Sequence, residues 1–309
     1  ITLDTLYYIL KIKNPKKLII LGDIKQLPPI GYGSLATSIY NHLFLESSFQ
    51  DICLAKMETS HRADDNSQFI KHSLTLRDKE KQLKEKDLNN NNGNFVLISY
   101  PNQDNQTIGE IIENIYKIEN ENNSNKFVNH IKELNKIIQI LTPNRIGESG
   151  TYAINEIFKN DLGGREAKEG LKFIYNKNDK ATGLSNGTMG YYEQVNEVNK
   201  ETKKVEQKDK INFDGKKVPY SGSFEDTNYE LGFSITVHKS QGSGFPIVIL
   251  VLPEKNNSLI TKELIYTALT RPEEKMYILY HEKNIKALTH LPSIPHRNMN
   301  LFDRDKLLW

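Results

Sequence analysis

The stretch Thr236-Val-His-Lys-Ser-Gln-Gly-Ser-Gly-Phe-Pro246, followed at once by the apolar run Ile247 to Leu252, sets the organisation of this chain. The apolar run has the length and composition of a buried strand. The stretch before it gathers polar residues and glycines, which let a backbone approach a ligand closely. Thr236 and Lys239 suit phosphate contacts, and His238 suits a contact with a base or sugar. This segment is therefore a candidate binding loop beside a core strand.

Apolar strands alternate with helical patterns on both sides of this segment. The expected strands are Leu18 to Leu21, Ile52 to Met57, Phe95 to Ser99, Ile137 to Leu141, Ile247 to Leu252 and Met276 to Tyr280. The expected helices are Leu3 to Leu10, Ser34 to Glu46, Gln68 to Lys79, Ile108 to Ile118, Phe127 to Leu134, Gly150 to Lys159 and Ser258 to Leu269. The alternation predicts an open, mostly parallel α/β sheet. The run Phe233 to Val237 fits either a strand or the start of a helix.

The helical periodicity disappears between about residues 165 and 232. Short apolar stretches, such as Leu171 to Tyr175 and Met189 to Tyr192, are separated there by the turn signals Asn186-Gly187 and Asp214-Gly215. We therefore expect a small antiparallel β module inserted into the α/β domain.

Composition excludes several classes of protein. The 309 residues contain 41 Lys and Arg against 39 Asp and Glu, a formal net charge of +2, so nucleic-acid binding would require a local groove. The single cysteine excludes a disulfide scaffold and a cysteine metal cluster. The longest apolar run is too short to span a bilayer, and no targeting signal is visible. We expect no membrane partner and a cytoplasmic location.

A second candidate site is Leu18-Ile-Ile-Leu-Gly-Asp-Ile-Lys-Gln-Leu-Pro-Pro-Ile-Gly-Tyr-Gly33. Its expected strand delivers Asp23 and Gln26 to a carboxyl end, where open α/β sheets bind ligands. Gln26 both donates and accepts hydrogen bonds, which suits a phosphate oxygen or an attacking water. The run Gly31 to Ala36 also fits a dinucleotide-binding fingerprint. However, its glycines lie about ten residues beyond the strand, with two prolines between, which argues against that reading.

Two arginines complete the candidates. Arg62, in Ser60-His61-Arg62, either reaches a phosphate from a strand end or is an ordinary surface arginine. Arg271 precedes Pro272, which disfavours helical geometry at Arg271 and places it where a helix ends. That position suits an arginine finger, and equally a cation at the negative end of a helix dipole.

Taken together, these stretches resemble superfamily 1 DNA helicases, most closely the RecD/TraA-like branch that moves 5′→3′. The residues that carry the resemblance are Gly22-Asp-x-x-Gln-Leu-Pro-Pro-Ile-Gly-x-Gly33 (motif III), Ser60-His61-Arg62 (motif IV), Thr236 to Ser243 (motif V), Tyr266-Thr-Ala-Leu-Thr-Arg271 (motif VI), Leu141-Thr-Pro143 and Gly150-Thr-x-x-x-Asn155. Asn186-Gly187 resembles part of the SH3-like module of that branch. Their order and spacing match along the chain.

The resemblance implies a RecA-like parallel sheet, as in the cores of P-loop NTPase helicases, with an inserted SH3-like antiparallel module. It divides the chain into the end of a first core (residues 1–50), the first part of a second core (51–164), the module (165–232) and the last part of the second core (233–309). It also implies ATP, Mg²⁺ and single-stranded DNA as cofactors and partners, in DNA repair or recombination, without identifying protein partners.

The resemblance assigns roles residue by residue. The catalytic residues would be Gln26, Arg62 and Arg271; the nucleotide contacts would be Asp23, Gln241, Gly242 and Ser243; the DNA contacts would be Thr142, Pro143, Thr236, His238 and Lys239. No metal ligand is expected in these residues.

The sequence also departs from the family pattern. Gly244 stands where the family usually has Glu, Pro272-Glu273 where it has Ala-Lys, and Ala63 where it has Gln. No Gly-x-x-x-x-Gly-Lys-[Ser/Thr] loop and no Asp-Glu pair after an apolar strand occurs. Because the chain begins at Ile1, we expect it to be the C-terminal part of an ATP-dependent helicase whose Mg²⁺ ligands lie upstream. These residues alone would then be inactive.

Two further readings stay open from sequence. The departures fit a degenerate, non-enzymatic nucleic-acid-binding subunit. A dinucleotide-dependent enzyme rests only on the run Gly31 to Ala36.

Overall fold

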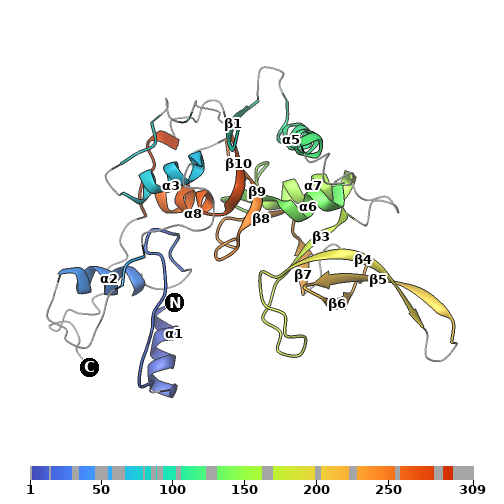
Figure 1. Ribbon diagram of the computed structural model, residues 1–309, viewed down its shortest axis with the longest axis horizontal. Helices are drawn as coiled ribbons and strands as arrows, with labels where there is room; N and C mark the ends of the chain where they lie inside the picture. The colour runs from blue at the N-terminus through green and yellow to red at the C-terminus, as the bar shows by residue number, and fades with distance from the viewer. Residues whose placement is uncertain are drawn as a thin grey trace.

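The structure, a computed structural model, contains two separate β-sheets (Figure 1). It describes residues 2–13, 15–29, 35–45, 55–57, 67–78, 81–84, 88, 93–101, 106–122, 131–161, 170–198, 203–222, 228–254, 258–281 and 288–294. Within these ranges no helix is long and apolar enough to cross a membrane.

The larger sheet has five parallel strands in the order β1-β10-β9-β2-β8. The strands are β1 (Phe95–Tyr100), β2 (Ile138–Thr142), β8 (Ser234–Thr236), β9 (Phe245–Val251) and β10 (Pro272–His281). Apart from Pro246, every residue of β2 and β9 is buried, because helices cover both faces of the sheet. The predicted open parallel α/β sheet is confirmed.

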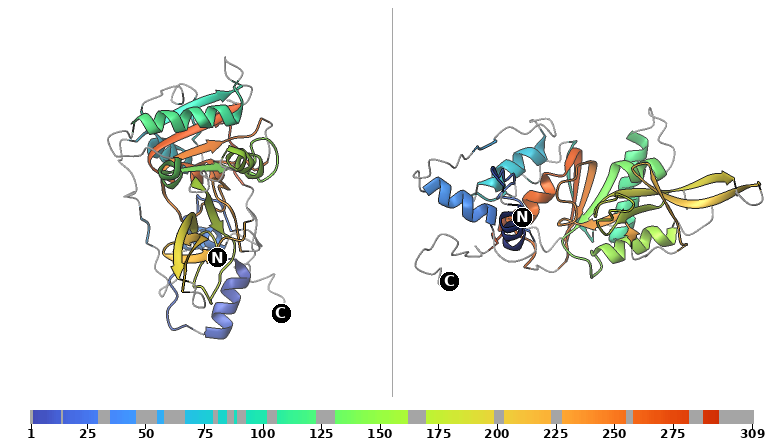
Figure 2. Two further views of the ribbon diagram at one scale, coloured as in Figure 1. Left: turned by 90° about the vertical axis from the view of Figure 1, so that its right-hand side faces the viewer. Right: turned by 90° about the horizontal axis from the view of Figure 1, so that it is seen from below.

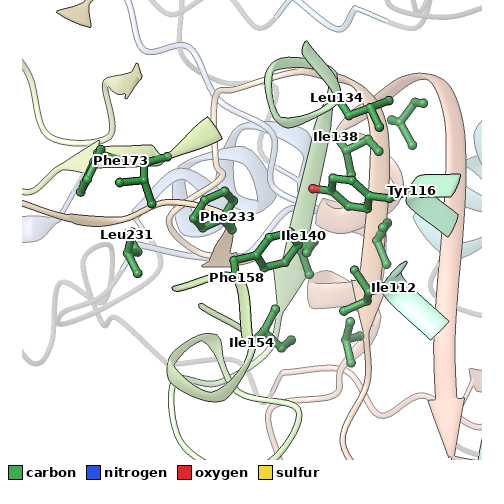
Figure 3. Close-up of a cluster of buried hydrophobic side chains, with 14 of the residues drawn as sticks. Ile112, Tyr116, Leu134, Ile138, Ile140, Ile154, Phe158, Phe173, Leu231 and Phe233 are labelled. Atoms are coloured by element: carbon green, nitrogen blue, oxygen red, sulfur yellow. The ribbon is translucent and has the colours of Figure 1, made fainter. Parts of the chain in front are cut away.

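The helices form a layer on each face of this sheet (Figure 1). One layer contains α3 (Gln68–Arg77) and α8 (Lys262–Leu269), and the other contains α5 (Ile108–Asn122), α6 (Ile131–Ile137) and α7 (Thr151–Asp161). Alternate side chains of β9 serve the two layers, since Ile247 and Ile249 join one buried cluster while Val248 joins the other. Figure 3 shows the first cluster, with the Phe158 and Phe233 rings stacked at 4.5 Å.

The N-terminal part lies outside this sheet and corrects one expectation. It contains α1 (Leu3–Tyr8), a single π-helical turn η1 (Ile9–Lys13) and α2 (Leu35–Leu45). The predicted strand Leu18 to Leu21 is wrong: the segment is extended without strand pairing, and Ile19 is 69% and Leu21 is 78% exposed. An apolar run becomes a strand only with a neighbour to pair with, and no described strand lies beside it. Half of the predicted strand Ile52 to Met57 falls outside the described residues, and the described half, residues 55–57, is not a strand.

The second sheet is the inserted antiparallel module. Its order is β6-β5-β4-β3-β7, formed by β3 (Lys172–Tyr175), β4 (Met189–Val198), β5 (Val205–Phe213), β6 (Lys216–Pro219) and β7 (Tyr229–Leu231). The β5–β6 turn uses Asp214 and Gly215 at φ of 49° and 85°, the left-handed pair that two-residue hairpins require. The long β4–β5 hairpin extends away from the parallel sheet, at the end of the molecule opposite α2 (Figure 2). The predicted antiparallel insertion is confirmed.

Two polar side chains, the buried Gln139 and the partly buried Asn155, fix the joint between the two sheets. Asn155 donates to the carbonyls of Leu231 and Ser234, both at 3.1 Å, and accepts from the Ser234 N–H at 2.8 Å. The Gln139 amide donates to the carbonyls of Gly232 and Phe233 at 3.1 and 3.0 Å. The chain leaving the module is therefore held against β2 and α7, which sets the orientation of β7 relative to the parallel sheet.

Lys172 is the buried cation of this joint. Its side chain is 1% exposed, and Nζ donates to the Ile138 carbonyl at 3.0 Å. Desolvation lowers the pKa of Lys172 to about 7.

The lowered pKa of Lys172 predicts that stability rises with pH. The unfolded chain retains the lysine proton up to the ordinary pKa of 10.5, whereas the folded chain releases it near 7, so the free energy of unfolding should increase between these values. Lys172→Met should flatten this dependence, and the exposed-lysine variant Lys177→Met should retain it. Urea denaturation across that pH range is the measurement. Equal pH dependence in wild type and Lys172→Met would contradict the assignment.

Candidate functional site

The segment 236–243 forms a compact loop between β8 and β9. Strand pairing continues through the Val237 N–H, which donates to the Thr142 carbonyl at 2.9 Å. Tight turns follow, in which Ser240 N–H donates to the Thr236 carbonyl and Ser243 N–H to the Ser240 carbonyl. Gly242 has a φ of +87°, a conformation that favours glycine. The two possibilities for this region are thus resolved as a short strand followed by turns.

The guanidinium of Arg271 fixes this loop to the end of α8. Its Nη1 donates to the carbonyls of Ser240 at 3.3 Å and Ser243 at 2.9 Å, and its Nε donates to the Thr267 carbonyl at 3.0 Å. The residue is 2% exposed. The helix does end ahead of Pro272, as the sequence predicted. Its Nη2 donates to Thr270 Oγ1 at 2.9 Å, so donors of Arg271 are engaged by both the loop and the end of α8. Arg271 lines neither of the two cavities described below.

The 22–29 segment docks on the same two elements. Tyr266 on α8 donates its hydroxyl to Asp23 Oδ2 at 2.9 Å, and the Leu27 N–H donates to Thr267 Oγ1 at 2.9 Å. Gln241 of the loop donates from Nε2 to the Leu27 carbonyl at 2.7 Å. Burial, followed by the charge of Asp23, raises the pKa of Tyr266, so this hydroxyl remains a donor.

A cavity of about 440 Å³ lies where these segments meet. Asp23, Gln26 and Gln241 all line it, so the structure brings together three of the predicted catalytic and nucleotide-contacting residues. Their carboxylate and amide groups suit hydrogen bonds to one edge of a nucleotide. No cluster of three or more His, Cys, Asp or Glu side chains that could hold a metal ion occurs in the described part of the chain.

A larger cavity of about 850 Å³ separates α7 and β8 from the antiparallel module. Thr236 and Lys239, two of the residues predicted to contact DNA, line it. Lys239 Nζ donates to Glu230 Oε1 at 2.7 Å and to Asn176 Oδ1 at 2.6 Å, and both partners belong to the module. We call this cavity the module groove.

The remaining predicted DNA contacts are more enclosed. Thr142 is 0% exposed, and its hydroxyl donates to the Asn144 carbonyl at 2.6 Å; Pro143 is buried as well. Both residues therefore shape the loop after β2, and neither side chain is presented to a ligand here. His238 is half-buried, and desolvation lowers its pKa, which favours a neutral ring.

Two predictions fall on residues that the structure does not describe. Arg62 lies outside the described residues, and so does most of the run Gly31 to Ala36 that carries the dinucleotide fingerprint.

Sequence reasoning missed two groups of residues at the site. Glu230 and Asn176 carry no local signal, because β3–β7 pairing (Ile174 with Glu230) brings the carboxylate to Lys239. Tyr266 and Thr267 do lie within the motif VI-like stretch, but their contacts with the 22–29 segment depend on tertiary structure.

The sequence of this chain is similar to those of several known proteins. Residues 231–279 match the UvrD-like helicase C-terminal domain. An uncharacterized protein of Methanocaldococcus jannaschii is 30% identical over 98% of this chain and 30% of its own length. The ATP-dependent RecD2 DNA helicase of Deinococcus radiodurans is 30% identical over 53% of this chain and 23% of its own. The RecD subunit of the RecBCD enzyme of Buchnera aphidicola (subsp. Schizaphis graminum) is 26% identical over 85% and 49%.

Among solved structures, Bacteroides Pif1 bound to ssDNA aligns with 84% of this chain and 61% of its own, at 13% identity and a TM-score of 0.41. The chain spans between 23% and 49% of the length of the three relatives above. The sequence matches relate this chain to the RecD-like superfamily 1 helicases, which confirms the resemblance of its motifs.

Thr267→Val should loosen the docking of the 22–29 segment. The substitution leaves the buried Leu27 N–H without its acceptor, at a cost of about 1–3 kcal/mol, so hydrogen exchange there should accelerate at least about fivefold. Thr75→Val is the matched control, because this partly buried threonine on α3 also donates its hydroxyl to the carbonyl four residues earlier. Unchanged exchange of the Leu27 amide in Thr267→Val would show that this contact does not hold the segment.

Proposed function

We propose that this chain forms part of an ATP-dependent DNA helicase that moves 5′→3′ along single-stranded DNA in the cytoplasm. The observation that carries the proposal is the hydrogen bond from Gln241 to the Leu27 carbonyl. It joins the cavity lined by Asp23 and Gln26 to the loop that presents Lys239 to the module groove. A conformational change at the cavity lined by Asp23 and Gln26 can thus be transmitted to the module groove, because Gln241 and Lys239 lie on the same loop.

The proposed roles rest on position for the residues that line the two cavities, and on the resemblance for the others. Gln26 senses the terminal phosphate from the 440 Å³ cavity. Asp23 and Gln241 line the same cavity and contact the nucleotide, and Thr236 and Lys239 line the module groove and contact DNA. Nucleotide contacts of Gly242 and Ser243 and a DNA contact of His238 are proposed on the resemblance. When bound, ATP supplies the free energy of its hydrolysis. Arg271 acts as a positioning residue, because its hydrogen bonds hold Ser240 and Ser243. Arg62 is proposed to approach the phosphate only on the resemblance.

A non-enzymatic nucleic-acid-binding subunit is the second candidate. It is favoured by Gly244 and Pro272-Glu273, which replace residues usual in the family, and by the enclosed position of Arg271. ATP turnover stimulated by single-stranded DNA, measured on the product of the whole gene, supports the helicase. DNA binding without turnover in that protein supports the subunit.

The chain itself should bind single-stranded DNA without hydrolysing ATP. The sequence contains no Gly-x-x-x-x-Gly-Lys-[Ser/Thr] loop to cradle phosphates, whereas the module groove and its cations are present. Fluorescence anisotropy with labelled oligothymidine and a phosphate-release assay measure the two properties. Robust ATP hydrolysis by the purified chain would contradict this expectation.

Lys239→Ala should weaken binding to single-stranded DNA and reduce its salt dependence by about one in the slope of log K against log salt, because one phosphate contact is lost. Lys117→Ala, an exposed lysine on α5, should leave both quantities unchanged. The same salt slope in Lys239→Ala and wild type would exclude Lys239 from the DNA contacts.

A further inference from the structure

The carboxylate of Glu230 lies in the module groove beside Lys239, the residue proposed to contact DNA. Glu230 Oε1 accepts hydrogen bonds from Lys239 Nζ at 2.7 Å and from Arg145 Nη2 at 3.1 Å. One carboxylate oxygen thus bridges two cations from different loops of the parallel-sheet domain. A phosphate oxygen carries the same charge and accepts the same bonds.

We infer that the module groove is a single-stranded DNA subsite in which Arg145 and Lys239 bind phosphate, Tyr152 stacks against a base, and Glu230 occupies the phosphate position until DNA displaces it. The inference rests on the proposed function and adds Arg145, Tyr152 and Glu230 to the residues that the motifs indicate.

The geometry of Glu230 allows its carboxylate to compete with a DNA phosphate for Lys239 and Arg145. Its backbone is fixed in β7 by antiparallel pairing with Ile174, while its side chain keeps 24% of its surface exposed. DNA therefore reaches the carboxylate without opening the sheet. When the Glu230 carboxylate moves away, Lys239 Nζ keeps its hydrogen bond to the neutral Asn176 Oδ1 at 2.6 Å. The ammonium therefore stays in the groove, and its positive charge is no longer neutralised by a carboxylate.

Arg145 and Tyr152 form the exposed wall of the groove. The Arg145 guanidinium carbon lies 5.7 Å from the centroid of the Tyr152 ring, and the Tyr152 N–H donates to the Arg145 carbonyl at 3.1 Å. Tyr152 is 49% exposed although it stands in the first turn of a helix, where its backbone is rigid. Exposed aromatic rings beside a cation are the platforms on which unpaired bases stack.

The charges that line the groove make its attraction for a phosphate backbone sensitive to Glu230. Three cations line the groove, Arg145, Lys159 and Lys239, against the carboxylates of Glu156 and Glu230. Lys159 is paired with Glu156 at 2.9 Å on the same helix. The attraction for a phosphate backbone therefore depends on Arg145 and Lys239, and Glu230 offsets about half of it.

The test is the affinity of the chain for labelled oligothymidine in Glu230→Gln. Removing the competing charge should tighten binding about three- to tenfold at low salt and steepen the salt dependence, because both cations then meet phosphate fully. Glu113→Gln, which removes one negative charge from the exposed face of α5, should bind as wild type. Unchanged or weaker binding in Glu230→Gln overturns the competitor role.

A second variant tests the stacking wall. Tyr152→Ala should weaken binding about 5- to 100-fold, since stacking of one base is lost, and Tyr152→Phe should bind as wild type. Affinity of Tyr152→Ala equal to wild type overturns the stacking assignment. If the wild-type chain does not bind oligothymidine, both the proposed function and the subsite are contradicted. If the wild-type chain binds and the Glu230 and Tyr152 variants bind with the same affinity, only the subsite is contradicted.

Discussion

The buried guanidinium of Arg271 is the interaction on which the site depends. A charge removed from water must find acceptors within the protein, and the carbonyls of Ser240, Ser243 and Thr267 provide them. The loop between β8 and β9 is consequently attached to the end of α8. A shift of the loop backbone would break both hydrogen bonds from Arg271 Nη1, so the loop and the end of α8 are held together as one unit.

This unit has a different partner on each side. Gln241 faces the 22–29 segment through the Leu27 carbonyl, and Lys239 faces the antiparallel module through Glu230 and Asn176. Only Ser240 separates these two residues, and Arg271 holds its carbonyl. Three parts of the chain that are far apart in sequence are therefore connected through a single turn. This connection provides the physical path by which a nucleotide cavity and a DNA groove could act together.

How far sequence reasoning succeeded depended on where the determining contacts lie. The apolar runs in β2 and β9 predicted strands correctly, because a strand buried on both faces is apolar along nearly its whole length. The same kind of run at Leu18 to Leu21 did not form a strand, since pairing partners are not visible in a local pattern. Thr236 and Lys239, which the sequence predicts to contact DNA, line the module groove. The enclosure of Arg271 and the arrival of Glu230 at Lys239 arise from tertiary packing and had no local signal.

The central claim is that the 22–29 segment and the 236–243 loop respond as one unit. Hydrogen exchange of the chain, compared with and without saturating oligothymidine, tests it most directly. The account predicts that DNA changes exchange both in the 236–243 loop and in the 22–29 segment, although only the loop lines the groove. A change confined to the groove, with the amides of 22–29 unaffected, would contradict the coupling.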